Sequence, residues 1–132
     1  MLLNSDEIST DSGLLLLRIS TAGTLLWQHG WPKLVHFTEK MGTFGDPIGL
    51  GPALSLGLIT FAETVCAALV LLGLWTRAST IPCIIGMGVA AFLAHGDAPF
   101  AKKELAVLYL FGFITILFTG SGRFSLDRLK FQ

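Results

Sequence analysis

The sequence predicts an all-α polytopic membrane protein, a bundle of four transmembrane helices. Of its 132 residues, 52% are hydrophobic and only 14% are charged, and the mean hydropathy is +0.70. A soluble domain carries about a quarter of charged residues, so much of this surface is expected to face lipid. Four apolar segments follow one another along the chain, each near the roughly 17 to 20 residues that a span requires. A lipid bilayer is therefore the first expected partner.

The first span is expected over residues 13–29, after a polar tail formed by residues 1–12. The tail holds Asp6, Glu7 and Asp11 but no lysine or arginine. A secretory signal begins with positive charge, so the first apolar segment is expected to remain in the protein as a span. The stretch "WQHGWPKL" closes this span. Its glycine and proline, Gly30 and Pro32, are expected to end the helix.

The remaining spans are expected over residues 51–75, 78–95 and 104–119, so that residues 13–120 form one membrane domain before a tail of residues 121–132. A tight turn around Arg77 makes spans two and three an antiparallel hairpin. The connection between spans one and two is longer, and its segment "LVHFTEKM", residues 34–41, is expected to form a short interfacial helix. In span three, Gly86, Ala90 and Ala94 recur every four residues, which lets a neighbouring helix approach closely.

Charge and cysteine content exclude several classes of function. The net charge is zero, so no basic field points to a nucleic acid partner. Cys66 and Cys83 lie in apolar runs without a CxxC motif, so neither a dithiol redox centre nor a thiolate metal site is indicated, and no metal is expected. The side that holds both termini carries slightly more positive charge, which favours a bacterial inner-membrane protein with cytoplasmic termini.

Two charged residues fall inside expected spans, Arg18 in the first and Glu63 in the second. A charge within a span costs several kcal/mol, at least about 2.5, unless it is paired or hydrated, and it is a functional candidate for that reason. Their depths differ by roughly 10 Å at 1.5 Å per residue, a gap that two long side chains can close. A clamp between the two spans and a role in ligand or proton binding both remain open.

A second polar group is expected at the opposite end of the bundle. His29 closes span one, Lys33 follows one turn later, His95 closes span three and Glu104 opens span four. Helix ends meet at similar depth in an antiparallel bundle, so these residues can converge at one mouth. Histidines beside a carboxylate can move protons, which makes His29, His95 and Glu104 the catalytic candidates. Taken singly, each is also an ordinary helix-end residue.

The ordered segments "LLRISTAGTLLWQHGWPKL", "ALSLGLITFAETVCAALVLLGLWTRAS" and "KKELAVLYLFGFITILFTGSGRFSLD" resemble the DoxX family of small bacterial membrane proteins. The resemblance runs from about Leu14 to Asp127. It implies a four-helix membrane bundle, and many members are described as oxidoreductases or as membrane partners in redox systems. The family pattern falls on the following residues of this chain: Arg18, His29, Lys33, Glu63, Arg77, His95, Glu104 and Tyr109.

We assign candidate roles to these residues. Arg18, Lys33, Glu63 and Tyr109 are candidates for ligand binding, whereas Arg77 and the Arg123 of the tail are expected to be structural. The missing cysteine pair argues against a thiol mechanism carried by this chain alone, and whether the chain is catalytic at all stays open.

Three functions follow as expectations. The first is a subunit of a quinone-linked redox system, with quinone as the only cofactor suggested. The second is a non-enzymatic scaffold or accessory subunit that packs against other membrane proteins or against itself. The third is a carrier of protons or small solutes, although the internal repeat of many transporters is missing.

Overall fold

The computed structural model describes residues 2–46, 49–94 and 97–131, and within these ranges it contains helices and no strand. The all-helical prediction is confirmed. Besides α-helices, four turns are π-helical, marked η. The elements in chain order are α1 Thr10–Arg18, η1 Ile19–Gly23, η2 Leu26–Gly30, α2 Trp31–Val35, α3 Phe37–Lys40, α4 Pro52–Phe61, η3 Ala62–Cys66, α5 Ala67–Leu72, α6 Thr76–Val89, η4 Ala90–Ala94, α7 Phe100–Thr119 and α8 Leu126–Phe131.

The first helix does not end at Gly30 and Pro32, which corrects the expectation from the sequence. The helical backbone continues through Gly30 and Trp31 into α2 and ends at His36, where φ is −104°. The wide turn η2 explains how the proline is tolerated. The N–H of Trp31 reaches back five residues to the carbonyl of Leu26, and the next residue, Pro32, has no N–H to place.

Two helical runs in the described residues are long and apolar enough to cross a bilayer, Pro52–Leu72 with 21 residues and Thr76–Ala94 with 19. They are the second and third expected spans, with slightly shifted ends. The fourth helix, α7, has 20 residues, and its first turns carry Lys102, Lys103 and Glu104. The expected interfacial segment, residues 34–41, contains the end of α2 and the whole of α3. It is therefore helical, but α2 is continuous with the first helix.

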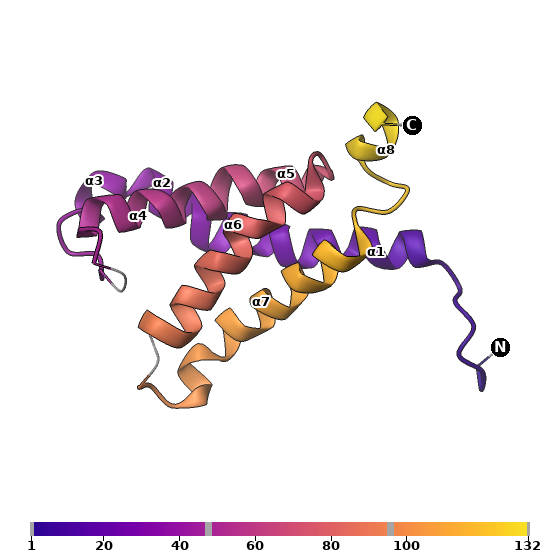
Figure 1. Cartoon of the computed structure of the whole chain (residues 1–132), viewed down its shortest axis with the longest axis horizontal. Coiled ribbons are helices and arrows are strands. Elements are labelled where there is room, and N and C mark those ends of the chain that lie inside the picture. Colours follow the sequence, from indigo (N-terminus) through magenta and orange to yellow (C-terminus); the bar gives the residue numbers. More distant parts are fainter. Residues whose placement is uncertain (1, 47–48, 95–96, 132) are drawn as a thin grey trace.

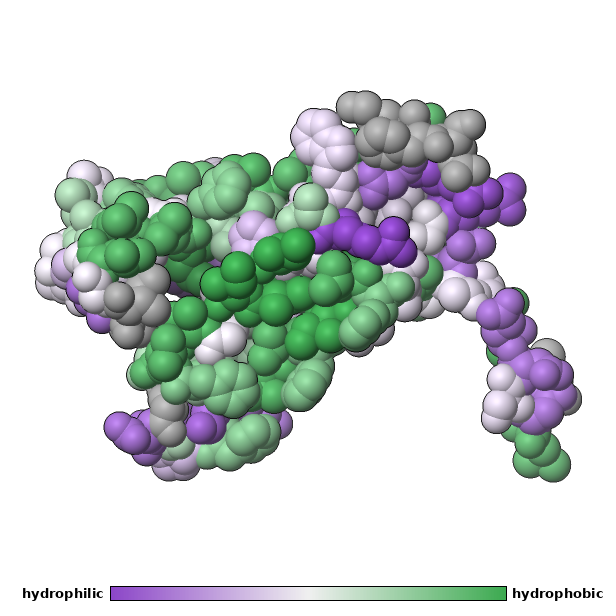
Figure 2. Space-filling model, in the orientation of Figure 1, coloured by the Kyte–Doolittle hydropathy of each residue, from purple (hydrophilic) through white to green (hydrophobic). Residues whose placement is uncertain are grey.

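Figure 1 shows two layers that diverge from one end, and each layer consists of two antiparallel helices. The first helix lies beside the run α4–η3–α5, and α6 and α7 form a hairpin that leans away from that run. The core lies where the layers meet, around Leu25, Val70, Phe113 and Ile116, which are at most 1% exposed. Hydrophobic residues cover much of the visible outer surface of the helices, while hydrophilic residues gather near the turns and the N-terminal arm (Figure 2).

The turn between the second and third helices depends on a residue far away in the sequence. Gly73 has φ +74°, and the N–H of Leu74 bonds the carbonyl of Leu69, the arrangement that commonly ends an α-helix at glycine. Trp75 follows with φ +47°, a conformation that costs a non-glycine residue energy. Asp127 stabilises it: one carboxylate oxygen accepts the Trp75 N–H at 2.6 Å, and the other accepts the N–H and the hydroxyl of Thr76 at 3.0 and 2.6 Å.

Asp127 therefore acts as the N-terminal cap of α6, although it lies 51 residues beyond Thr76. Other residues of the same end have similar roles. Arg77 donates from Nε to the carbonyl of Leu117 near the end of α7, and Asp11 accepts the backbone N–H of Arg123. The C-terminal segment is thus a loop that fastens the ends of α1, α6 and α7 together.

We predict that Asp127→Ala lowers the free energy of unfolding by about 1 to 2 kcal/mol, the cost of losing a helix cap. Partial burial opposes ionisation of Asp127, but hydrogen bonds from Thr76 and Trp75 outweigh it and hold its pKa below the ordinary value. The stabilisation is therefore present above about pH 4, the unfolded pKa, and is lost as the pH falls through the folded pKa.

Thermal unfolding in detergent between neutral and acidic pH measures both effects. The difference between wild type and Asp127→Ala should shrink in acid, and Asp6→Ala on the exposed N-terminal arm should behave like wild type. A difference that does not change with pH would contradict the cap.

Candidate functional site

The first and second helices touch backbone to backbone where Gly30 meets Glu63. A Cβ atom placed on Gly30 would lie 2.1 Å from the carbonyl oxygen of Glu63 and 3.0 Å from Cγ2 of Thr64. No side chain fits there, so glycine is required by close approach rather than by helix termination. Gly30, the glycine of "WQHGWPKL", thereby lets the following turn, which carries Lys33, lie close to η3.

Lys33 lies three residues after Gly30 and reaches Glu63 from α2. Its Nζ is 2.7 Å from Oε1 of Glu63, and the two side chains are 19% and 3% exposed. A carboxylate so deeply buried is costly unless it is paired, and Lys33 supplies the opposite charge while keeping contact with solvent. This ion pair is the centre of the candidate site.

His29 and Tyr109 lie next to the pair. Their rings meet edge to face, with centroids 5.8 Å apart and an angle of 84° between the planes. The fourth helix reaches this position because Gly112 lets it approach the first one: a Cβ on Gly112 would lie 2.6 Å from Cγ2 of Thr21. Tyr109, one turn before Gly112, is then 6% exposed.

Electrostatic interaction joins these residues into one cluster. The charge of Glu63 acts on Tyr109 and on Cys83, and the charge of Lys33 acts on His29. We call His29, Lys33, Glu63 and Tyr109 the polar cluster. It offers a buried acid, a partly hydrated base, an imidazole and a phenol within the apolar body of the bundle, which are the groups that hold or relay a proton.

Arg18 does not pair with Glu63, contrary to the expectation that these two charges meet. The Arg18 side chain is 2% exposed and donates five hydrogen bonds to backbone carbonyls of Val70, Leu71, Ser121 and Phe124, at 2.6 to 3.2 Å. Phe124 accepts two of them. A guanidinium has five N–H groups, so all of its donors are used. Arg18 therefore joins the end of α5 to the C-terminal loop and keeps no donor for Glu63.

Of the mouth expected from His29, Lys33, His95 and Glu104, the structure describes three residues. Lys33 turns inward to Glu63, and Glu104 is exposed near the start of α7. His95 lies outside the described residues. Tyr109, which only the family resemblance suggested, joins the cluster instead. The sequence marked Glu63 as a buried charge that needs a partner, but the choice of Lys33 as that partner depends on the depth at which the first and second helices cross.

The described part of the chain contains no group of three or more histidine, cysteine or acidic side chains that could hold a metal ion. Cys66 and Cys83 are buried and unbridged. The thiol of Cys83 donates to the carbonyl of Ala62 at 3.4 Å. Both cysteines therefore serve the packing of α6 against η3.

An apolar cavity of about 600 Å³ lies between α4 and α6, in the wedge where the two layers diverge. Ala62, the residue before Glu63, lines it, as do the small residues Gly86, Ala90 and Ala94 of the third helix. Ser55 supplies a hydroxyl near one end. A cavity of this size and lining suits a largely hydrocarbon molecule.

Comparison with known proteins identifies relatives over most of the chain. A family model described as DoxX matches residues 13–96. An uncharacterised membrane protein of Mycobacterium tuberculosis is 34% identical over 122 residues, which cover 72% of this chain and 74% of the relative. An uncharacterised protein of Haemophilus influenzae is 34% identical over 130 residues, covering 90% and 91%. No solved structure matches.

We predict that Gly30→Ala destabilises the bundle by about 1 to 3 kcal/mol, because the added methyl must push η2 away from η3. Thermal unfolding in detergent measures the loss. Gly88→Ala is the matched control, since its methyl meets open space on the third helix. Equal melting temperatures of the two variants would contradict the close approach.

We predict that Arg18→Lys, which keeps the charge, still costs about 3 to 5 kcal/mol, because an ammonium has three donors and cannot replace five hydrogen bonds at a buried site. The fraction of folded protein recovered from membranes measures the effect. Arg123→Lys, at an exposed position, should be recovered like wild type. Normal recovery of Arg18→Lys would show that charge alone suffices.

Proposed function

The chain belongs to the DoxX family of membrane proteins, and on this basis we propose that it is a four-span inner-membrane subunit of a quinone-linked redox system. The four spans are the helical run of residues 10–35, the runs Pro52–Leu72 and Thr76–Ala94, and α7. Both termini lie in the cytoplasm, beside the arginines of the C-terminal loop, in accord with the positive-inside rule. The short helix α3 lies at the opposite membrane interface.

The observation that carries the proposal is the Lys33–Glu63 ion pair, buried among apolar helices with His29 and Tyr109 beside it. Ionisable residues at membrane depth are rare and mark proton or substrate pathways. Arg18, Arg77 and Asp127 make their hydrogen bonds at the far end of the bundle. The polar cluster adds a second, separate set of charges, which favours a functional role.

The residues present fit a quinone. The apolar lining of the cavity between α4 and α6, which includes Ile59, Ala62, Pro82 and Gly86, would hold its ring and hydrocarbon tail. When bound, a quinone supplies a carrier that takes up two electrons and two protons, with the electrons provided by a partner oxidoreductase.

The polar cluster supplies what such a carrier needs from this chain. Glu63 holds a proton or releases it, and Lys33 offsets the charge of the carboxylate when the proton is absent. Because the Lys33 side chain is 19% exposed, it connects Glu63 with water. His29 relays protons between the cluster and the membrane surface, and Tyr109 fixes the orientation of its ring.

A second candidate function is that of a scaffold in a larger membrane complex, and the five hydrogen bonds of Arg18 favour it. They show that buried charge in this chain can be wholly structural. In that case Lys33 and Glu63 hold the first two helices together and perform no chemistry.

We predict that Glu63→Gln leaves the amount of folded protein within about twofold of wild type, because Lys33 can turn to solvent, but lowers quinone-reducing activity with the native partner by about tenfold or more. Activity in reconstituted membranes and extraction of quinone from the purified protein are the two measurements. Glu39→Gln, an exposed position on α3, is the matched control.

The outcomes separate the two candidates. Normal abundance with lost activity supports the redox role. Lower abundance with unchanged activity per folded molecule supports the scaffold. Absence of quinone from the extract, together with full activity of Glu63→Gln, would reject the proposed function.

A further inference from the structure

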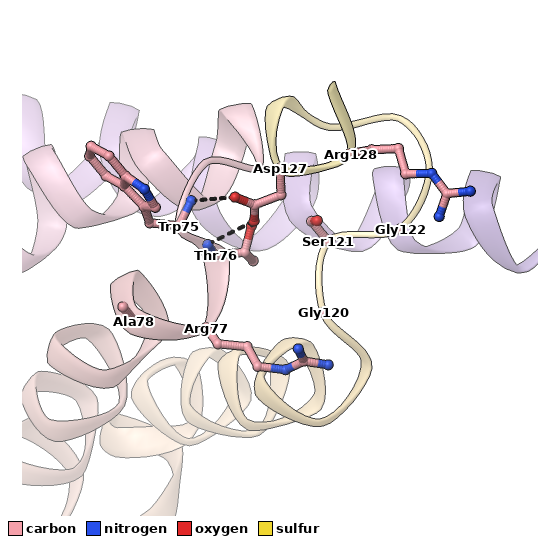
Figure 3. A pocket seen from close by; sticks show the side chains of 9 residues that line it. All are labelled: Trp75, Thr76, Arg77, Ala78, Gly120, Ser121, Gly122, Asp127 and Arg128. Carbon is pink, nitrogen blue, oxygen red and sulfur yellow. Dashed lines mark hydrogen bonds between the residues drawn. The ribbon is translucent and has the colours of Figure 1, made fainter. Parts of the chain in front are cut away.

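A second cavity, of about 460 Å³, lies at the end of the bundle where the C-terminal loop meets α6. None of the four residues of the polar cluster lines it. Figure 3 shows Arg77 at its lower side and Arg128 at its upper side, with the loop from Gly120 to Gly122 between them. The residues lining the cavity are Trp75, Thr76, Arg77, Ala78, Gly120, Ser121, Gly122, Asp127 and Arg128.

The lining of this cavity carries more positive than negative charge. Asp127, the carboxylate in the lining, is fully engaged with Trp75 and Thr76 at the N-terminus of α6 (Figure 3). Asp11 accepts the N–H of Arg123 on the same loop. Two arginines, Arg77 and Arg128, line the cavity against the single carboxylate of Asp127.

Arg77 keeps donors free for a ligand. Its Nε bonds the carbonyl of Leu117, which anchors the side chain, while Gly120 leaves room beside the guanidinium: a Cβ there would lie 3.2 Å from Nη2. Arg128 is exposed. Arg77 and Arg128 both line the cavity from opposite sides, and a guanidinium can give a phosphate charge-assisted hydrogen bonds.

The surface beside the cavity is apolar. Ile81 and Ile85 follow Arg77 at intervals of four residues on the third helix, and they are 48% and 61% exposed. Phe118, close to the carbonyl that Arg77 bonds, is 80% exposed on α7. A cationic cavity thus continues into an exposed hydrocarbon surface along α6 and α7, part of the apolar area in Figure 2.

We propose that this cavity binds the phosphate of an anionic phospholipid, whose acyl chains lie along the exposed apolar residues of α6 and α7. The proposal rests on the membrane topology given above, which places this end at the cytoplasmic leaflet, where anionic lipids concentrate. The bound lipid would hold the C-terminal loop against the third and fourth helices.

Native mass spectrometry of the full-length protein in a neutral detergent, with equal amounts of phosphatidylglycerol and phosphatidylcholine, tests the proposal. Wild type should retain phosphatidylglycerol in preference. Arg128→Gln should lower that retention about fivefold. The double variant Arg77→Gln/Arg128→Gln should lower it further, since each arginine near the surface contributes about equally to the binding of an anionic lipid. Arg123→Gln, whose side chain lies outside the cavity lining, should retain the lipid like wild type.

Three results would overturn the proposal. They are equal retention of both lipids, an equal effect of Arg123→Gln and Arg128→Gln, and displacement of phosphatidylglycerol by inorganic phosphate at the same concentration, which would identify free phosphate as the ligand. Arg128 is exposed, so Arg128→Gln keeps the test valid even if Arg77→Gln loosens α7. Quinone content of Arg128→Gln should equal that of wild type, so failure of this proposal and failure of the redox role remain distinguishable.

Discussion

The five hydrogen bonds of Arg18 are the constraint on which the rest of this fold depends. A guanidinium buried at 2% exposure is tolerated because each of its donors meets a backbone carbonyl at a helix end or in the C-terminal loop. The end of the second helix and the C-terminal loop are thereby held against the first helix. From this fixed loop Asp127 reaches the N-terminus of α6, and Arg77 in the first turn of α6 then reaches the end of α7.

Fixing one end of the bundle leaves the other end free to diverge. Close approaches of Gly30 to Glu63 and of Gly112 to Thr21 hold the middle of the bundle, and beyond them the hairpin of α6 and α7 leans away from α4. The polar cluster lies at these crossings, and the apolar cavity lies in the wedge beyond. The charges of Arg18, Arg77 and Asp127 and those of the polar cluster are thus separated along the length of the bundle.

Some of this arrangement follows from local sequence and some does not. Apolar segment lengths predicted the helices, and the cost of burying charge identified Arg18 and Glu63 as residues needing partners. Which partners they have could not be predicted, because carbonyls at helix ends, such as those of Val70 and Ser121, compete with carboxylates for arginine and are invisible in a sequence. Gly30 and Pro32 were misread as a helix end, since a π-helical turn accommodates the missing N–H.

The sequence by itself determined the helical class, the second and third apolar runs, the family, and the two charges, Arg18 and Glu63, that fall inside apolar helices. Composition and periodicity act locally, so they are readable along the chain. The tertiary structure decided that Lys33 rather than Arg18 neutralises Glu63, that Tyr109 joins His29, and that Asp127 caps a helix 51 residues away. Each of these contacts depends on how deep neighbouring helices lie and where they cross. The crossing points are set in the folded chain, for example where Gly30 and Gly112 let two helices approach closely.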